Sequence, residues 1–259
     1  MTARKSSRVT VADVSKTFDG DDGPVRALSD VDFSVQDGEF VCIVGPSGCG
    51  KTTLFRIIGG LDPASRGEVL LSGDPVTGPD PDLGIVFQEY HLFPWRTVRG
   101  NVAFGLEQAS VAADERDQRV SRMLELVGLE QAADSYPSRL SGGMKQRVAI
   151  ARALAVDPEI LLMDEPFGSV DAQTRTMLHG ETLDIWAETG KTVLFVTHDV
   201  SEAVTLADRV VVMAPSPGRV REIVPIDLDR PRDRTAEGFA RHVDRIRGLI
   251  GEAATHRQS

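Results

Sequence analysis

The fold of this chain is decided by Gly45-Pro46-Ser47-Gly48-Cys49-Gly50-Lys51-Thr52, which follows the apolar run 40–44 and opens a helical pattern. In such a strand, turn and helix, the glycines let backbone N–H groups curl around phosphate oxygens, while the lysine neutralises the β- and γ-phosphates. The Thr52 hydroxyl at the helix start is suited to ligate Mg²⁺. The sequence therefore predicts a nucleotide phosphate site, formed by Gly45, Pro46, Ser47, Gly48, Cys49, Gly50, Lys51, Thr52 and Thr53.

A second anion-binding helix start is predicted at Leu140-Ser141-Gly142-Gly143-Met144-Lys145-Gln146-Arg147. Serine is a favoured N-cap, and the N–H groups in the first turn of a helix attract phosphate. Ser141, Gly142 and Gly143 are therefore candidate nucleotide-binding residues. Two phosphate-binding helix starts in one chain indicate a shared nucleotide.

A catalytic acid pair is predicted where the apolar run 160–163 ends in Asp164-Glu165. Parallel sheets present catalytic groups at the carboxyl ends of their strands. Asp164 is suited to hold Mg²⁺ through water, and Glu165 to polarise the water that attacks a γ-phosphate. The alternative is that this Asp-Glu-Pro run is a solvated turn.

Two more polar residues follow apolar runs, Gln88 after 85–87 and His198 shortly after 193–196. An amide at Gln88 is suited to contact Mg²⁺ and the attacking water. His198 would point the same way as Asp164 if their strands are neighbours. A histidine at a strand end is more often structural than catalytic, so only the surrounding motifs favour a catalytic His198.

Composition places the chain among soluble globular proteins, with 41% hydrophobic and 26% charged residues. The formal net charge of -10 argues against nucleic acid as a partner, because nucleic-acid binders carry a basic footprint. Cys42 and Cys49 are too few and too close for a disulfide framework, which favours a reduced, cytosolic setting. No apolar run approaches the ~20 residues that cross a bilayer, so we expect any membrane role to be peripheral, through a partner.

The hydrophobic pattern predicts an α/β core with a helical insert. Short β-branched runs that are apolar on both faces are typical of a covered, mainly parallel sheet. The predicted strands are 9–14, 31–35, 40–44, 85–87, 160–163, 193–196 and 210–213. Between 89 and 158 apolar residues recur at helical spacing, and helices are also expected at 172–188 and 201–207.

The stretch after Ser216 has its own charge balance, with nine arginines against seven acids, or about +2. Phe239, Val243, Ile246 and Ile250 mark one face of a terminal helix. The simpler interpretation is that this face packs on the chain's own domain. Binding of a partner is the alternative.

In combination these motifs closely resemble the ATP-binding subunits of ABC transporters, from about residue 8 to about residue 220. The shared order is the phosphate loop, Gln88, Leu-Ser-Gly-Gly-Met-Lys-Gln-Arg, Met-Asp-Glu-Pro, Ser169-Val170-Asp171 and His198. The resemblance implies one ABC ATPase domain over 1–259, an α/β P-loop NTPase (RecA-like) core with an antiparallel β subdomain. Core segments 1–88 and 159–215 would flank an inserted α-helical signature subdomain at 89–158, and an Arg-rich tail with a terminal helix would occupy 216–259.

The resemblance also implies a Mg²⁺-dependent ATPase in which two copies of the subunit face each other head to tail. Each ATP would lie between the phosphate loop of one copy and Ser141-Gly142-Gly143 of the other. Phe18 would stack on adenine, Asp171 would couple the two sites, and His198 would contact the γ-phosphate. The catalytic set is then Glu165, His198, Lys51 and Gln88, and the metal set is Thr52, Gln88 and Asp164.

A narrower likeness, to importers of nitrate, sulfonates and taurine, lies in Val86-Phe87-Gln88-Glu89-Tyr90-His91-Leu92-Phe93-Pro94-Trp95-Arg96-Thr97-Val98. It implies a peripheral place at the cytoplasmic face of the cell membrane, on integral permease subunits supplied by an extracytoplasmic solute-binding protein. Tyr90, Phe93 and Trp95 would line the groove that receives a permease helix. For Phe93 and Trp95, aromatic packing inside the helical subdomain is the alternative.

Other functions explain less of the sequence. A soluble ATPase of the same fold, in DNA repair or translation, usually carries long coiled-coil or tandem-domain insertions, which this sequence does not show. An exporter, or an importer for pyrimidine precursors or another small organic solute, would keep every motif, because the transport path belongs to other polypeptides. A P-loop kinase would leave the run 140–147 unexplained.

Overall fold

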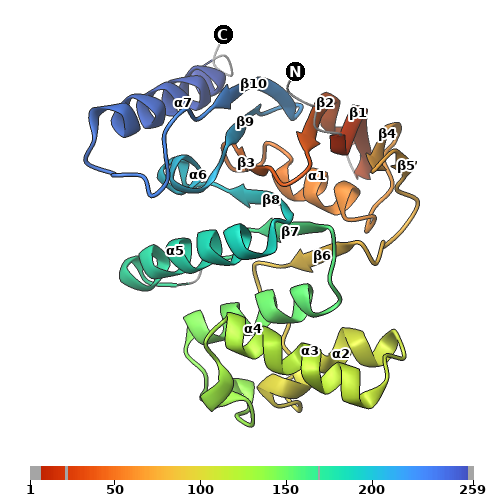
Figure 1. The fold of residues 1–259 in the computed structure, drawn as a ribbon. Helices are drawn as coiled ribbons and strands as arrows, with labels where there is room; N and C mark the ends of the chain where they lie inside the picture. The colour runs from red at the N-terminus through yellow and green to blue at the C-terminus, as the bar shows by residue number, and fades with distance from the viewer. Residues whose placement is uncertain (1–6, 21–22, 169, 256–259) are drawn as a thin grey trace, which may run out of the picture. The chain divides into compact units, whose positions relative to one another are not determined.

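The computed structural model describes residues 7–20, 23–168 and 170–255, which form two compact units (Figure 1). The first unit joins two segments of the chain, Met1–Asp80 and Thr192–Ser259, and the second is the continuous stretch Pro81–Lys191. Ser169, part of one motif named above, lies outside the described residues. In the described ranges, no helix combines the length and the apolar character that a membrane span requires.

The first unit is built around β3 (Phe40–Val44), which lies between two parallel neighbours, β8 (Thr192–Thr197) and β9 (Arg209–Ala214). An antiparallel strand, β10 (Arg219–Pro225), pairs with the other edge of β9. All residues of β3 and β8 are buried, which explains why these runs lack polar alternation. Helix α1 (Lys51–Ile58) contacts β8, and α6 (Val200–Leu206) contacts β3.

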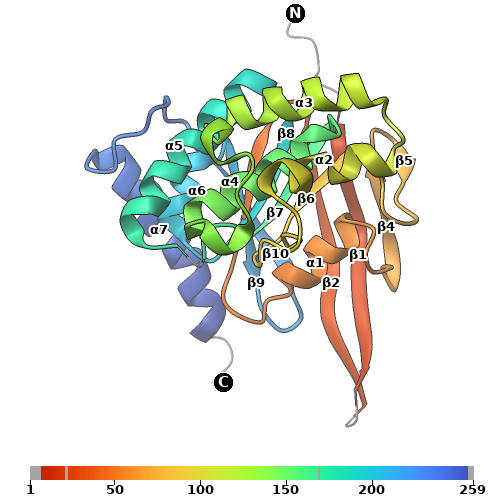
Figure 2. The same ribbon diagram turned by 90° about the horizontal axis from the view of Figure 1, so that it is seen from below.

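A second sheet of the first unit is antiparallel, in the order β2-β1-β4-β5. Figure 2 shows the long hairpin of β1 (Ser7–Gly20) and β2 (Gly23–Gln36) reaching past α1. Strands β4 (Arg66–Leu71) and β5 (Asp74–Pro75) complete it. The expected antiparallel β subdomain is therefore confirmed.

The second unit holds the predicted helices. It contains two parallel strands, β6 (Leu83–Val86) and β7 (Ile160–Asp164), and its helices are α2 (Val98–Gln108), α3 (Ala113–Leu126), α4 (Gly142–Ala155) and α5 (Ala172–Thr189), with short 3-10 helices η1 (Glu130–Ala132) and η2 (Pro137–Arg139). The helical pattern at 89–158 is thus confirmed as α2, α3 and α4. The compact unit is wider than that insert, because it also includes β6, β7 and α5. The division of the chain into subdomains at 89 and 158 stays a prediction.

The terminal helix α7 (Glu237–Thr255) packs on its own unit, alongside β9, β10 and α6 (Figure 1). Phe239, Val243 and Ile246 of its predicted apolar face are buried, and Ile250 is half-buried. The simpler interpretation of the tail is therefore confirmed for this face.

An arginine pair, Arg230 and Arg232, attaches the segment before α7 to the end of α6. The Arg232 guanidinium donates to the carbonyl oxygens of Val204 and Ala207, both at 2.6 Å, and to those of Leu228 at 3.1 Å and Ile226 at 3.3 Å. Arg230 donates to Asp208 at 2.7 Å and to the Leu206 carbonyl. Carbonyl groups at a helix end lack partners within the helix, so these arginine side chains cap the C-terminal end of α6, whose C-cap residue is Ala207.

Candidate nucleotide and catalytic sites

The phosphate loop joins β3 to α1 in a conformation that glycine permits. Gly48 and Gly50 have φ of +75° and +88°, in the left-handed region that disfavours a side chain. A Cβ at Gly50 would lie 2.6 Å from Leu28 Cδ2, and one at Gly45 would lie 2.6 Å from Cys49 Sγ and 2.9 Å from the Met213 carbonyl oxygen. Backbone angle and close packing therefore both require the glycines of the predicted motif.

The loop also presents the groups that a phosphate needs. Helix α1 begins after Gly50 without a side-chain bond from its N-cap and without an acid in its first turn, so no carboxylate of that turn competes for its first N–H groups. Lys51 is only 8% exposed, and its ammonium donates to the carbonyls of Gly45 at 2.9 Å and Pro46 at 3.3 Å. Thr52 is exposed and Thr53 half-buried on the same turn. This arrangement of N–H groups around a lysine fits a polyphosphate.

Cys49, in the middle of the loop, is a free and buried thiol. Burial raises the pKa of Cys49 above its usual range, although the Lys51 ammonium acts in the opposite direction. A thiol that stays protonated is a weak nucleophile. Cys49 therefore contributes packing to the loop, and its N–H closes the loop by donating to the Pro46 carbonyl at 3.2 Å.

His198 lies beside the phosphate loop in the same unit. Val44 and Thr197 are paired in register at the ends of β3 and β8, so Gly45 and His198 leave adjacent parallel strands at the same level. A cavity of about 550 Å³ is lined by loop residues Gly45, Pro46 and Ser47, by His198, Asp199 and Val200, and by Arg247, Ile250 and Gly251 of α7. The motifs predicted the first two walls. The wall from α7 was not predicted.

In the second unit, Gln88 and Glu165 both lie close to Gly168. Val86 of β6 pairs with Met163 of β7, and each predicted residue comes two positions after its member of that pair. A Cβ at Gly168 would lie 3.5 Å from Gln88 Nε2 and 3.9 Å from Glu165 Cβ. The structure thus brings together two predicted catalytic residues. Gly168, which lies close to both, was missed, and its signal in the sequence was the Glu-Pro-Phe-Gly turn.

Glu165 has a strained backbone, with φ of +42° and a half-buried side chain. Non-glycine residues seldom adopt this conformation, and such strain is concentrated at functional positions. Asp164, one residue earlier, is only 9% exposed at the end of a buried strand. A solvated turn does not describe these carboxylates.

The predicted N-cap of α4 is confirmed. Ser141 Oγ accepts from the Met144 N–H at 3.3 Å, and Gly142 is exposed on the first turn. Gly143 is buried, and a Cβ there would lie 2.9 Å from Thr174 Cγ2 of α5. Gly143 therefore allows the starts of α4 and α5 to approach closely.

Asp171 caps α5. Its carboxylate accepts from the N–H groups of Gln173 at 3.1 Å and Thr174 at 3.0 Å, and from the Thr174 hydroxyl at 2.6 Å. The hydrogen bonds from Thr174 hold the pKa of Asp171 below its usual value. These bonds give Asp171 a structural role, and its role in coupling two sites stays a prediction.

The motifs occur within one sequence family. The family model described as ABC transporter matches residues 28–168, a span that includes the phosphate loop, Gln88, the start of α4 and Glu165. This chain belongs to the ABC transporter family.

Known ABC proteins match most of the chain. The nitrate import ATP-binding protein NrtD of Synechococcus elongatus is 49% identical over 86% of this chain and 82% of its own length. The aliphatic sulfonates import ATP-binding protein SsuB of Bacillus thuringiensis subsp. konkukian is 43% identical over 89% of this chain and 91% of its own length. A dimeric ATP-binding cassette, MJ0796, solved in a post-hydrolysis state with ADP and Pi, is 35% identical, with a TM-score of 0.74 over 85% of this chain and 100% of that one. The chain is therefore an ATP-binding, ATP-hydrolysing ABC transporter ATPase, and the predicted α/β P-loop NTPase class is confirmed.

The predicted metal ligands of this ABC ATPase are a hydroxyl, an amide and a carboxylate. Such hard oxygen donors suit Mg²⁺, which usually retains water and binds phosphate oxygens as well. Thr52 belongs to the first unit, and Gln88 and Asp164 belong to the second. Across the described ranges, no group of three or more His, Cys, Asp or Glu side chains is placed to hold an ion. The donor chemistry fits Mg²⁺, and the site stays a prediction.

Phe18, the predicted adenine-stacking residue of this ABC ATPase, lies on β1. Its ring is 42% exposed, with the Lys16 ammonium 5.0 Å from the ring centroid. Exposed aromatic rings and nearby cations are features of sites that stack nucleobases. The stacking role itself stays a prediction.

Two aromatic residues of the predicted permease groove differ in environment. Phe93 is half-buried and packs on Phe104, with ring centroids 4.4 Å apart. Trp95 is 72% exposed, with its ring centroid 5.6 Å from that of Phe93. Packing inside the helical region therefore describes Phe93, whereas Trp95 presents its ring to solvent.

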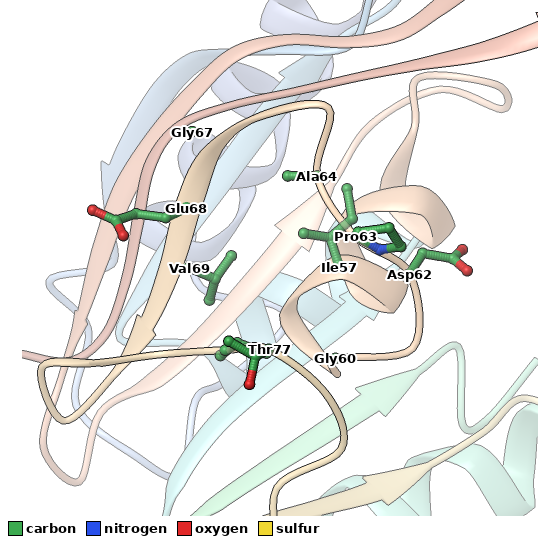
Figure 3. A pocket seen from close by; sticks show the side chains of 10 residues that line it. Ile57, Gly60, Asp62, Pro63, Ala64, Gly67, Glu68, Val69 and Thr77 are labelled. Atoms are coloured by element: carbon green, nitrogen blue, oxygen red, sulfur yellow. The ribbon is translucent and has the colours of Figure 1, made fainter.

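A further cavity of the first unit, about 380 Å³, lies near the end of α1 and β4 (Figure 3). Figure 3 shows the carboxylates of Asp62 and Glu68 directed away from its centre, and Arg56 pairs with Asp62 at 2.6 Å. Gly60, on its wall, has φ of +65° and a Cβ position 2.0 Å from the Gly78 carbonyl oxygen. With no convergent charged groups, this cavity does not resemble a catalytic site.

Proposed function

We propose that this ABC ATPase powers an importer for a small oxyanion, namely a sulfonate, taurine or nitrate. The ATPase part of the proposal rests on one observation: Gln88 and Glu165, whose backbone is strained, both lie close to Gly168. The solute class is supported by the likeness to the nitrate and sulfonate proteins and by the run from Gln88 to Val98. An importer for another small organic solute is the second candidate, because the transport path lies in other polypeptides.

Binding begins at the phosphate loop. Backbone N–H groups of the loop surround the phosphates of ATP, and Lys51 exchanges its loop carbonyls for β- and γ-phosphate oxygens. The α4 start supplies a second set of N–H groups, because Ser141 is its only side-chain cap and Gly142 is exposed. In a head-to-tail homodimer, the Ser141-Gly142-Gly143 segment of one copy covers the γ-phosphate held by the other. A dimeric cassette with ADP and Pi supports this arrangement.

Hydrolysis then needs an oriented water and stabilised phosphate charge. Glu165 accepts a hydrogen bond from the attacking water, and the Gln88 amide holds that water in line with the γ-phosphate. Lys51 and His198 stabilise the negative charge on the transferring phosphoryl group. Thr52, Gln88 and Asp164 would hold Mg²⁺, which would supply charge neutralisation for the phosphate oxygens.

The chemistry is coupled to transport through a protein surface. Tyr90 and Trp95 lie two and seven positions after Gln88, so a change at the catalytic amide is transmitted along a short segment to the exposed ring of Trp95. That surface receives a helix of an integral permease subunit at the cytoplasmic face of the membrane. A solute-binding protein on the other side delivers the oxyanion.

Solute uptake in cells that lack this chain tests the proposal. Taurine, longer alkanesulfonates and nitrate are supplied separately, and the cells are complemented with the wild type or with Glu165→Gln. We expect one uptake to be lost, restored by the wild type and not by the variant. Unchanged uptake of all three, with loss of another solute such as a pyrimidine precursor, would favour the second candidate. Co-purification with nucleic acid or ribosomes, and with no membrane subunits, would indicate a soluble ABC ATPase of DNA repair or translation.

A further inference from the structure

The cavity beside the phosphate loop has one wall that the proposed mechanism does not use. Arg247, Ile250 and Gly251 of α7 line it together with the loop residues and His198. All of these residues belong to the first unit, so the cavity is complete within one copy of the chain. Its volume of about 550 Å³ is ample for the terminal phosphate groups of a nucleotide.

Arg247 differs from the neighbouring arginines of α7 in its partners. Arg241 lies 3.9 Å from Glu237, and Arg245 pairs with Glu222 at 2.5 Å. Arg247 is exposed and makes no ion pair with any residue in the described ranges. Its positive charge is therefore available to an anionic ligand.

The acidic residue of the same cavity is already engaged. Asp199 Oδ1 accepts from the N–H groups of Ser201 at 2.8 Å and Glu202 at 3.2 Å, which caps α6. A carboxylate used as an N-cap is a weaker competitor for a guanidinium across a cavity. The loop N–H groups, His198 and Arg247 then favour a negative ligand.

The backbone of Arg247 is held in place by packing. Ile246, the preceding residue, is fully buried, and Phe239 and Val243 are buried on the preceding turns. Because α7 packs against β9, β10 and α6, the Arg247 backbone has a fixed position on this wall. A preorganised cation loses less entropy on binding than one on a flexible segment.

We propose that Arg247 is a further phosphate-binding residue, which contacts the terminal phosphate of ATP from the α7 side of the cavity. This inference rests on the proposed nucleotide site. ADP lacks the terminal phosphate, so the contact discriminates ATP from ADP. Through this contact, the C-terminal helix α7 makes the affinity for ATP higher than the affinity for ADP.

The test compares affinities of the full-length chain for ADP and for the non-hydrolysable ATP analogue with a β,γ-imido bridge. Arg247→Gln should weaken binding of the analogue roughly threefold to tenfold at low salt and leave ADP binding unchanged. The loss should shrink at high salt, because ions screen an exposed contact. Arg247→Lys should restore part of the affinity, because it restores the charge. The matched control is Arg241→Gln, an equal charge change at a side chain that is 74% exposed on the same helix, and it should alter neither affinity.

Three results would overturn the inference. Equal weakening of ADP and analogue would mean that Arg247 supports the loop without contacting the terminal phosphate. Unchanged affinities would mean that it touches no nucleotide. A change in self-association alone, measured by sedimentation, would mean that the cavity meets a second copy. If the wild type bound neither nucleotide, the proposed nucleotide site itself would fail, which is a separate result.

Discussion

Arg232→Met should destabilise the protein by about 3 kcal/mol, since four hydrogen bonds from one charged group are lost. The substitution keeps the apolar stem of Arg232 and deletes the donors to the carbonyls of Val204, Ala207, Ile226 and Leu228. A bond from a charged donor is worth roughly 1.5–3 kcal/mol when taken singly. The four share one group, and water reaches some of the freed carbonyls because Arg232 is only half-buried, so the sum is well below four times that value.

Burial of the guanidinium offsets part of this stabilisation. Burial, with a smaller contribution from the nearby Arg230 charge, lowers the pKa of Arg232 to about 10. The unfolded chain therefore binds more protons than the folded one between about pH 10 and the higher ordinary pKa of an arginine, and this group makes stability rise with pH only in that window. At neutral pH the side chain is protonated in both states. The loss caused by Arg232→Met should therefore be the same from pH 6 to pH 9.

Urea unfolding followed by circular dichroism would measure the change. The matched control is Arg219→Met, which removes an equal charge from an exposed position of the same tail and should change the free energy of unfolding by under about 0.5 kcal/mol. A loss below about 1 kcal/mol for Arg232→Met would refute the capping role, and so would an equal loss in the control.

Three further predictions concern the catalytic cycle. Glu165→Gln should retain ATP binding and lower turnover at least about a hundredfold, as measured by phosphate release; normal turnover would remove Glu165 as the group that activates water. Lys51→Ala should lose most ATP affinity in a nucleotide titration, because the charge opposite the phosphates is gone, and unchanged binding would place the nucleotide elsewhere. Ser141→Arg should leave ATP binding by a single copy near normal. It should abolish ATP hydrolysis, because the larger side chain obstructs the γ-phosphate held by the other copy. ATP hydrolysis that survives the change would contradict the shared site.

The elements that the sequence predicted best are the strands that are buried along their whole length. Strand β3 was predicted residue for residue, and β7 and β8 nearly so, because every residue in them is buried and the predicted stretches are entirely apolar. The polar part of β1 was not predicted, since Thr17 and Phe18 are held there by ladder pairing with Arg26 and Val25 and not by burial. The edge strands β5 and β10 and the exposed first half of β4 were missed for the same reason, since strand segments with exposed polar residues have no hydrophobic signature.

The candidate site was predicted as a set of residues and not as an arrangement. The motifs named Gln88 and Glu165, but their proximity follows from the parallel register of Val86 with Met163, which main-chain pairing sets. The strain at Glu165 left no pattern in the sequence. The wall from α7 left none either, because it depends on contacts between distant segments. Asp171 was named for its coupling role, and its capping of α5 was not foreseen.

The divided first unit imposes an order on events at the ribosome. The whole of Pro81–Lys191 is synthesised before the second segment of the first unit appears, so the continuous unit is free to fold first. At that stage β3 has not yet paired with β8 and β9, which are synthesised later. Gly45 packs against the Met213 backbone at the end of β9, so the phosphate loop is completed only when that strand has emerged. A nascent chain that ends before β9 thus carries the entire phosphate-binding motif without the surroundings that shape it.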